Sequence, residues 1–216
     1  MRALLRLVEP LQLGRVLELE PLGEHWQRVL IEPARTPPPR RAAPTLEVVV
    51  ARGLTRRYTP ARLDGDALEV VVFLHGAGPG TRWVKELSPG SRVAYRWLES
   101  GLELADRPGE HVLCGDESCL GLTHRLARGA GGARHFIAAL ESALPLPPGV
   151  ATWLPRTRHR AEAQWRWLAR QSRRASFYLA GHGPSVRRLA RQLADSGVPR
   201  ARILTSTHWA EGRPGL

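Results

Sequence analysis

The sequence predicts a β plus α/β protein, in which a small antiparallel β-barrel of Greek-key type precedes a doubly wound α/β domain. Segments rich in valine and aromatic residues, separated by short Gly, Asp and Pro turns, occupy the first half of the 216 residues. After Gly109 the periodicity changes, and apolar strand-like segments alternate with segments of helical spacing. We therefore place the barrel domain at residues 1–107 and the α/β domain at residues 108–216.

The barrel half contains several short predicted strands. The apolar pattern over 14–31 favours two strands that join around residues 21–23. Residues 33–44, PARTPPPRRAAP, are expected to form an exposed connection, because proline lacks the amide hydrogen that a strand ladder requires. Further strands are predicted over 46–51, 68–74 and 91–97.

The second half alternates between strand and helix periodicity. Strands are predicted over 111–114, 134–141, 150–154, 176–180 and 203–207, and helical spacing covers 120–128, 159–173 and 185–196. Gly181 and Gly183 form a Gly-x-Gly after the buried strand 176–180, which is where doubly wound sheets bind their ligands. A glycine turn with no ligand explains the same two residues.

The charge of the chain indicates an anionic partner. The chain has 32 Lys and Arg residues, of which only Lys85 is a lysine, against 20 acidic residues, for a formal net charge of +12. Nucleic acid is one candidate, but the arginines are spread along the chain and few aromatic residues are present to stack on bases. We therefore expect no nucleic-acid binding, and consider a dinucleotide, whose phosphates arginine can clamp, the better partner.

We also expect a cytoplasmic monomer with neither a membrane span nor a protein-bound metal. The N-terminus lacks a long apolar stretch and a small-residue cleavage site. Cys114 and Cys119, the only cysteines, have neither zinc-site nor disulfide spacing, and the eight histidines are not paired with Glu or Cys.

Two segments have the residue types of a flavin site. In the first, Arg56, Tyr58 and Thr59 offer a cation for a phosphate, a ring to cover a planar group and a hydroxyl for the edge of that group. In the second, the Gly-Pro-Gly-Thr turn at 78–81 offers backbone N–H groups to a pyrophosphate. Each segment alone is also typical of an edge strand or a turn, so the hypothesis depends on their order and spacing.

A series of motifs along the chain resembles one protein family. The motifs are RRYT at 56–59, FLHG at 73–76, GPGTRW at 78–83, GDES at 115–118, ALE at 139–141, VATWL at 150–154, LAG at 179–181 and HWAEG at 208–212. This series is similar to that of the siderophore-interacting proteins, which are flavin-dependent ferric-siderophore reductases within the ferredoxin-reductase-like superfamily. The resemblance covers most of the chain.

The resemblance implies an FAD site on the barrel and a nicotinamide site on the α/β domain. Arg56 would meet the FAD phosphates, Tyr58 would lie against the isoalloxazine, and Thr59 would hydrogen-bond the ring near its reactive nitrogen. The ribityl-pyrophosphate region would be held by His75, Gly78, Pro79, Gly80 and Thr81, with Trp83 opening the helix packed beneath. The nicotinamide of NADPH or NADH would approach Gly115, Asp116, Glu117 and Ser118, bordered by Gly181, His182 and Trp209.

Four of these residues, Tyr58, Thr59, Asp116 and Ser118, are the candidates for a catalytic role. Asp116 and Ser118 also suit a helix N-cap, and the two interpretations are compatible. The function implied by the resemblance is the reduction of an anionic ferric chelate, a siderophore, with release of the iron as Fe(II).

The chain departs from the family pattern at several positions. The second arginine of the barrel motif comes one residue late, at Arg62, and histidine replaces the usual acid at His182 and the usual phenol at His208. Protonation of these two histidines would favour the extra phosphate of NADPH, whereas neutral histidines would be packing residues. A flavin- or siderophore-binding protein without turnover is the alternative function.

Overall fold

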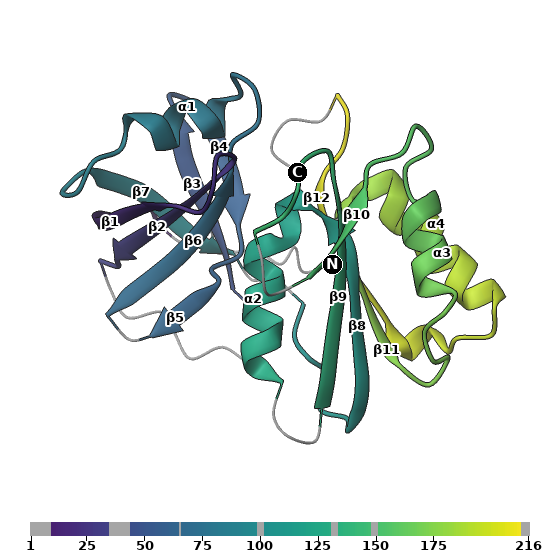
Figure 1. The fold of residues 1–216 in the computed structure, drawn as a ribbon. Coiled ribbons are helices and arrows are strands. Elements are labelled where there is room, and N and C mark those ends of the chain that lie inside the picture. Colours follow the sequence, from purple (N-terminus) through teal and green to yellow (C-terminus); the bar gives the residue numbers. More distant parts are fainter. Residues whose placement is uncertain are drawn as a thin grey trace, which may run out of the picture.

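The computed structural model describes residues 10–34, 44–64, 66–98, 102–130, 134–147 and 151–212. Two β-sheets follow one another along the chain, an antiparallel sheet and then a parallel sheet, and helix α2 (Leu120–Gly129) lies between them (Figure 1). The fold class expected from the sequence is confirmed.

The described part of the antiparallel sheet has seven strands, in the order β4-β3-β7-β1-β2-β6-β5. Their bounds are β1 Gln12–Pro21, β2 Trp26–Glu32, β3 Thr45–Ala51, β4 Leu54–Tyr58, β5 Arg62–Asp64, β6 Ala67–Phe73 and β7 Arg92–Leu98. The sheet curls so that β4 also contacts β6. Helix α1 (Pro79–Glu86) packs on β3 and β6, and its Trp83 and Val84 join the apolar core that the curled sheet encloses.

The parallel sheet has the order β10-β9-β8-β11-β12 in the described residues. Its strands are β8 Gly109–Asp116, β9 Arg134–Ser142, β10 Thr152–Pro155, β11 Ser176–His182 and β12 Ile203–Trp209, and its further helices are η1 Glu117–Cys119, α3 Glu162–Leu168, α4 Gly183–Asp195 and η2 Arg200–Arg202. From β8 the chain first builds outward through β9 and β10, and then returns to the other side of β8 with β11. The order of the strands therefore reverses between β8 and β11, which is where such sheets open a ligand crevice at their carboxyl ends.

The two sheets share one apolar cluster. Trp26 of β2 and Val71 of β6 pack in the same cluster as Leu122 and Leu126 of α2 and Tyr178 of β11. Helix α2 approaches the antiparallel sheet so closely that a Cβ atom at Gly121 would overlap the backbone carbonyl of Thr59. A glycine is therefore required at this contact.

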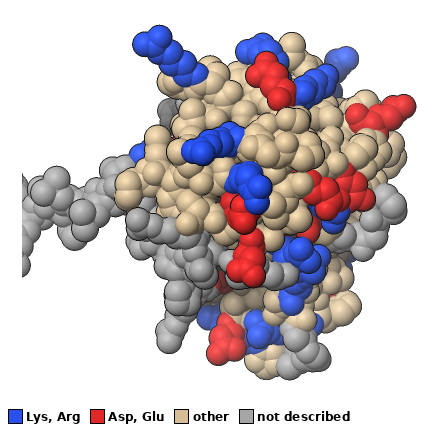
Figure 2. Space-filling view, turned by 90° about the vertical axis from the view of Figure 1, so that its left-hand side faces the viewer, with Lys and Arg blue, Asp and Glu red and all other residues tan. Residues whose placement is uncertain are grey.

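Basic and acidic side chains are interspersed on the surface of the antiparallel sheet. Figure 2 shows this face, on which blue and red side chains lie among one another instead of forming a single basic patch. Part of the reason is pairing within the sheet, since Arg15 contacts Glu32 at 2.9 Å and Arg28 contacts Glu18 at 3.2 Å. The excess of arginine is therefore partly used in ion pairs along β1 and β2.

Some sequence expectations differ from the structure. The helix expected over 159–173 begins only after Ala161, which has a left-handed φ of 72°, and ends at Leu168 because residues 169–174 are mostly exposed and have no apolar face to bury. The short strand β5 was not expected. Of the predicted connection at 33–44, residues 35–43 lie outside the described part of the chain.

Residues 181–183, expected to form a Gly-x-Gly loop, belong to a strand and a helix. Strand β11 runs through His182, and α4 begins at once with Gly183. Gly181 instead has a φ of 100° within the strand, and its Cα lies against the carboxylate of Asp116. The need for a glycine there comes from this close approach, because a side chain would overlap the carboxylate.

Candidate functional site

A cavity of about 670 Å³ lies between the two sheets. Its barrel wall comes from β4, β6 and the turn into α1. Its opposite wall comes from the segments that follow β8, β9 and β10 and from the last two residues of β12. Its volume lies within the range of about 300 to 1,000 Å³ that is usual for sites of small molecules and cofactors. The cavity is therefore the candidate cofactor site.

Tyr58 and Gly80 form the centre of the barrel wall. A Cβ atom at Gly80 would lie 2.8 Å from the hydroxyl of Tyr58, so the glycine lets the phenol rest on the first turn of α1. Beneath it the ring stacks on Trp83 with a centroid distance of 6.0 Å. Burial raises the pKa of Tyr58 to about 12, although the positive charge of Arg56 acts in the opposite direction, so the hydroxyl is a protonated donor at neutral pH.

The turn that leads into α1 is fixed by a pair of hydrogen bonds. The backbone N–H of His75 donates to the Oγ1 of Thr81 at 3.2 Å, and that hydroxyl donates to the carbonyl of His75 at 3.1 Å. The first turn of α1 reads Pro-Gly-Thr-Arg and is neutral or basic, and Pro79, Gly80 and Thr81 line the cavity. The positive end of the helix dipole therefore faces the cavity, and this arrangement suits a phosphate.

Arginines on both walls give the cavity positive charge. Arg56 extends from β4, and Arg156 follows β10 on the opposite wall. Burial lowers the pKa of His75, and both Arg56 and Arg156 lower it further. Because His75 experiences both cations, we infer that their fields converge near this ring, where an anionic ligand is favoured.

Glu117 and Arg156 form an ion pair on the α/β wall. Burial raises the pKa of Glu117, as does the neighbouring Asp116, while Arg156 opposes the shift. Glu117 therefore offsets part of the positive charge on this wall and holds the arginine close to the strand ends.

Ser118 and His208 make a second polar contact on that wall. The hydroxyl of Ser118 donates to Oδ1 of Asp116 at 2.5 Å and lies 3.2 Å from Nδ1 of His208. Since the single hydroxyl hydrogen is directed to the carboxylate, Nδ1 of His208 must be the donor in the second contact. Burial lowers the pKa of His208, which leaves a neutral ring with Nε2 as an acceptor.

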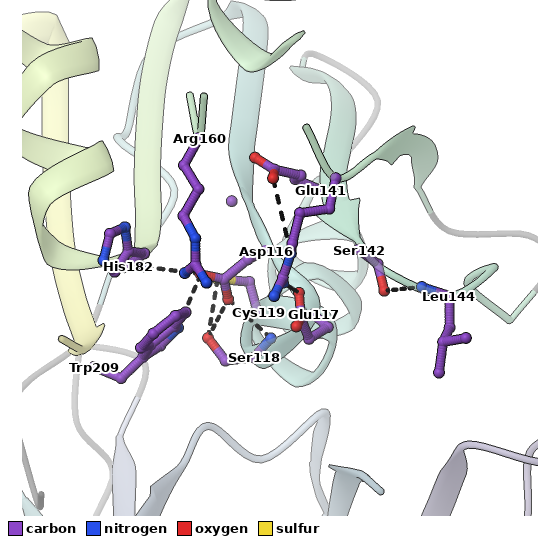
Figure 3. Close-up of polar contacts among 12 residues, drawn as sticks. Asp116, Glu117, Ser118, Cys119, Glu141, Ser142, Leu144, Arg160, His182 and Trp209 are labelled. Atoms are coloured by element: carbon purple, nitrogen blue, oxygen red, sulfur yellow. Dashed lines mark hydrogen bonds and ion pairs between the residues drawn. The ribbon is translucent and has the colours of Figure 1, made fainter. Parts of the chain in front are cut away.

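Asp116 organises the strand ends at the switch point (Figure 3). Its Oδ1 accepts from the backbone N–H of Ser118 at 3.0 Å as well as from the hydroxyl, so it caps η1. Its Oδ2 accepts from the backbone N–H of His182 at 2.7 Å and from Nε1 of Trp209 at 2.9 Å. Both oxygens are therefore engaged within the protein, and this geometry suits a positioning role. The catalytic role expected of Asp116 from the sequence stays a prediction.

The cavity brings together most of the site residues expected from the sequence. Its lining includes Arg56, Tyr58, His75, Gly78, Pro79, Gly80, Thr81, Glu117, Ser118 and Trp209. Thr59, Trp83, Gly115, Asp116, Gly181 and His182 do not line it.

These six residues lie outside the lining and make other contacts. Trp83 lies in the middle of α1, so the helix opens at Pro79 and not at Trp83 as expected. Thr59 packs its carbonyl against α2, and Gly115 packs against Cys119 and the carbonyl of Ala180. His182 is buried, with its ring 4.6 Å from that of Trp209 and its Nδ1 2.8 Å from Oγ of Ser185.

The structure adds residues that sequence reasoning missed. Arg57, Phe73, Leu144 and Arg156 also line the cavity, together with His25, Val71, Val72, Leu74, Gly76 and Ala143. His208, which the sequence placed beside the nicotinamide, lines it as well. Leu144 and Arg156 lie two residues and one residue beyond the carboxyl ends of β9 and β10. The general rule that ligands meet the carboxyl ends of parallel strands could have identified both.

In the described residues, no helix is both long and apolar enough to cross a lipid bilayer. Within the same residues, no group of three or more His, Cys, Asp and Glu side chains is arranged to hold a metal ion.

The fold of this chain is similar to the folds of solved reductase structures. Phthalate dioxygenase reductase, described as a modular structure for electron transfer from pyridine nucleotides to [2Fe-2S], is similar with a TM-score of 0.69 at 14% identity, over 91% of this chain and 68% of its own. No family model and no curated protein sequence matches the chain.

Within this class, structures of siderophore proteins match nearly the full length. A siderophore utilization protein from T. fusca has a TM-score of 0.76 at 20% identity and is covered over 97% of both chains. The siderophore-interacting protein from Acinetobacter baumannii has a TM-score of 0.78 at 13% identity, over 96% of this chain and 93% of its own. The similarity in fold that the sequence motifs imply is thereby confirmed.

Proposed function

We propose that this protein is an FAD-dependent, NAD(P)H-driven reductase of ferric siderophores or similar ferric chelates. The observation that carries the proposal is the cavity between the two sheets. One wall presents an arginine and a helix N-terminus suited to phosphates, and the other presents the strand ends of a topological switch point. The similarity in fold to siderophore-interacting proteins and to pyridine-nucleotide reductases supports it.

The lining fits the parts of a flavin nucleotide. Arg56 and the N-terminal turn of α1 would hold the phosphates through a charge-assisted contact and backbone N–H groups. Tyr58, Phe73 and Leu144 offer apolar surface to a planar ring and exclude water from it. Gly80 supports the fit, because any larger residue there would displace Tyr58.

The α/β wall would receive the nicotinamide. Ser118, His208 and Trp209 line it, and Nε2 of the neutral His208 is an acceptor for an amide N–H. Asp116 acts from behind by holding both Ser118 and Trp209. When bound, a flavin supplies the change from a two-electron hydride donor to one-electron acceptors.

The substrate side depends on charge. Arg57 lines the cavity and its side chain is 40% exposed. It lies 3.6 Å from Glu47, but Glu47 also pairs with Arg96, so positive charge remains for an anionic chelate. Reduction loosens the chelate, because hard oxygen ligands hold Fe(II) less tightly than Fe(III).

Three measurements on the purified chain test the proposal in turn. After reconstitution with FAD and removal of the free flavin, the protein should still absorb at about 450 nm. Anaerobic addition of NADPH or NADH should bleach this band, and a ferric siderophore should restore it while Fe(II) appears in a colorimetric assay. Failure to retain any flavin would overturn the proposal. Flavin retained without reduction by either nicotinamide would instead favour the binding protein without turnover.

A further inference from the structure

A second, much smaller cavity lies behind Asp116, inside the α/β domain. Its volume is about 10 Å³, and its wall includes Glu141 of β9, Gln164 of α3, His182 of β11 and Arg156. Figure 3 shows Glu141, Arg160 and His182 on different segments around Asp116. One water molecule needs roughly 10 to 15 Å³ by this measure, so the space suits a single water.

Four atoms on its wall are buried and have no hydrogen-bond partner within the described part of the protein. They are Oε1 of Glu141, Nε of Arg156, Oε1 of Gln164 and Nε2 of His182. Glu141 and Gln164 are only 4% and 3% exposed. A buried polar atom without a partner destabilises the fold by roughly 1 to 3 kcal/mol, so four such atoms around one cavity indicate an occupant.

The geometry of the ion pair in this cavity also points to an occupant. Nε of Arg156 and Oε1 of Glu141 are 3.8 Å apart, which is too long for a direct hydrogen bond. A polar pair at such a distance is typical of contact through a bridging water. Arg160, the other cation on the wall, lies over the ring of Trp209 at 4.9 Å and contacts Glu211 at 3.6 Å.

We infer that a single water molecule occupies this cavity and hydrogen-bonds to Glu141, Gln164, Arg156 and His182. Water can donate two hydrogen bonds and accept two. The oxygens of Glu141 and Gln164 accept two, and the N–H groups of Arg156 and His182 supply two, so every partner is satisfied. An ammonium or metal cation could not accept from Arg156, and an anion would meet the carboxylate of Glu141.

The same count assigns the tautomer of His182. If Nε2 were an acceptor, the water would have to donate to Glu141, Gln164 and His182 together, which exceeds its two hydrogens. Nε2 therefore carries the hydrogen, and Nδ1 accepts from the hydroxyl of Ser185 at 2.8 Å. Burial and the nearby Arg160 lower the pKa of His182, which agrees with a neutral ring.

The water also links the two cavities. Among the described residues, Arg156 alone lines both of them. Its Nε is buried without a hydrogen-bond partner in the described residues, and its terminal nitrogen pairs with Glu117 at the large cavity. The water thus acts as a positioning element for the cation that the α/β domain contributes to the candidate cofactor site.

A crystal structure at about 1.5 Å and a ¹⁵N NMR spectrum of the histidine side chains test the inference on the wild-type protein. We expect a density peak within hydrogen-bond distance, below about 3.2 Å, of at least three of the four atoms. The NMR spectrum should show His182 protonated at Nε2 and unprotonated at Nδ1. An empty cavity, a peak with the distances of a metal ion, or the Nδ1–H tautomer would each overturn the inference.

A pair of variants checks that the polar wall holds the water. Gln164→Met keeps the length of the side chain but replaces the acceptor by an apolar group on the wall of a cavity that has room for only one water, so the peak should disappear. Gln192→Met is the matched control, because Oε1 of Gln192 is also buried without a partner in the described residues but does not line this cavity. The water peak should persist in the control, and loss of the peak in both variants, or in neither, would contradict the assignment.

Discussion

The indole Nε1 of Trp209 donates a hydrogen bond of 2.9 Å to Oδ2 of Asp116, which fastens the end of β12 to the end of β8. These two strands are not neighbours, because β11 lies between them. The carboxylate therefore spans three strand ends at the switch point. It holds Trp209 and Ser118 at the wall of the large cavity without lining that cavity itself.

Asp116→Asn should destabilise the protein while leaving the flavin site nearly intact. Each carboxylate oxygen now accepts from two donors. The amide keeps the size of the carboxylate, but its NH₂ group replaces one oxygen and cannot accept from the two donors that face it. We expect the free energy of unfolding, measured by urea denaturation, to fall by about 1 to 3 kcal/mol.

The Kd for NAD(P)H should also rise in Asp116→Asn, because the NH₂ group meets the donors of either Ser118 or Trp209, and both residues line the wall that would receive the nicotinamide. The Kd for FAD should change little. Asp106→Asn is the control, since Asp106 is exposed. Equal stability of the two variants would show that the network around Asp116 contributes little.

Arg56→Ala should weaken flavin binding by removing one charge-assisted phosphate contact. Hydrogen bonds to charged groups contribute about 1.5 to 3 kcal/mol, so the Kd for FAD, measured by fluorescence titration, should rise by about 10-fold to 100-fold. Arg62→Ala is the control, because Arg62 lies on β5 near Glu69 and does not line the cavity. An unchanged Kd in Arg56→Ala would place the phosphates elsewhere.

Gly80→Ala should displace Tyr58, because the added methyl group would lie 2.8 Å from its hydroxyl. The Kd for FAD should rise, and the thermal unfolding midpoint should change little because both groups border a cavity. Removing the hydroxyl with Tyr58→Phe in the Gly80→Ala background should recover most of the affinity. Additive effects of the two substitutions in a double-mutant cycle would rule out the contact as the cause.

Buried histidines should make the protein less stable as the pH falls. The pKa values of His182 and His208 are lowered in the folded state by burial, so below about pH 6.5 the unfolded chain binds more protons than the folded one. The free energy of unfolding should therefore decrease from pH 7 toward pH 5. In His182→Asn this decrease should be smaller.

The difference between wild type and His182→Asn isolates the contribution of His182 to the pH dependence of the free energy of unfolding. The raised pKa values of Glu117 and Glu141 act in the opposite direction in both proteins, so they cancel in the difference. Neutral histidines also predict that the ratio of kcat/KM for NADPH and NADH stays constant from pH 8 to pH 6. A ratio that rises at low pH would restore the hypothesis of charged histidines at the nicotinamide.

The barrel motif could be predicted from sequence because its chemistry is local. Arg56 and Tyr58 share one strand, and Gly78–Thr81 is one turn, so spacing alone indicated what they could do. The role of Asp116 could not be predicted this way, since its partners His182 and Trp209 are brought to it only by the strand order of the sheet. Arg156 belongs to no motif, so only its place directly after a strand of the parallel sheet could have indicated it.

The apolar cluster that Trp26 and Val71 share with α2 limits how this chain could be recombined with its structural relatives. A hybrid that takes its first half from this protein and its second half from another reductase would bring together surfaces that were not selected to fit. At Gly121, any partner carrying a larger residue would push the Thr59 backbone out of place. In such a hybrid, α2 and the barrel that it contacts must therefore come from the same protein.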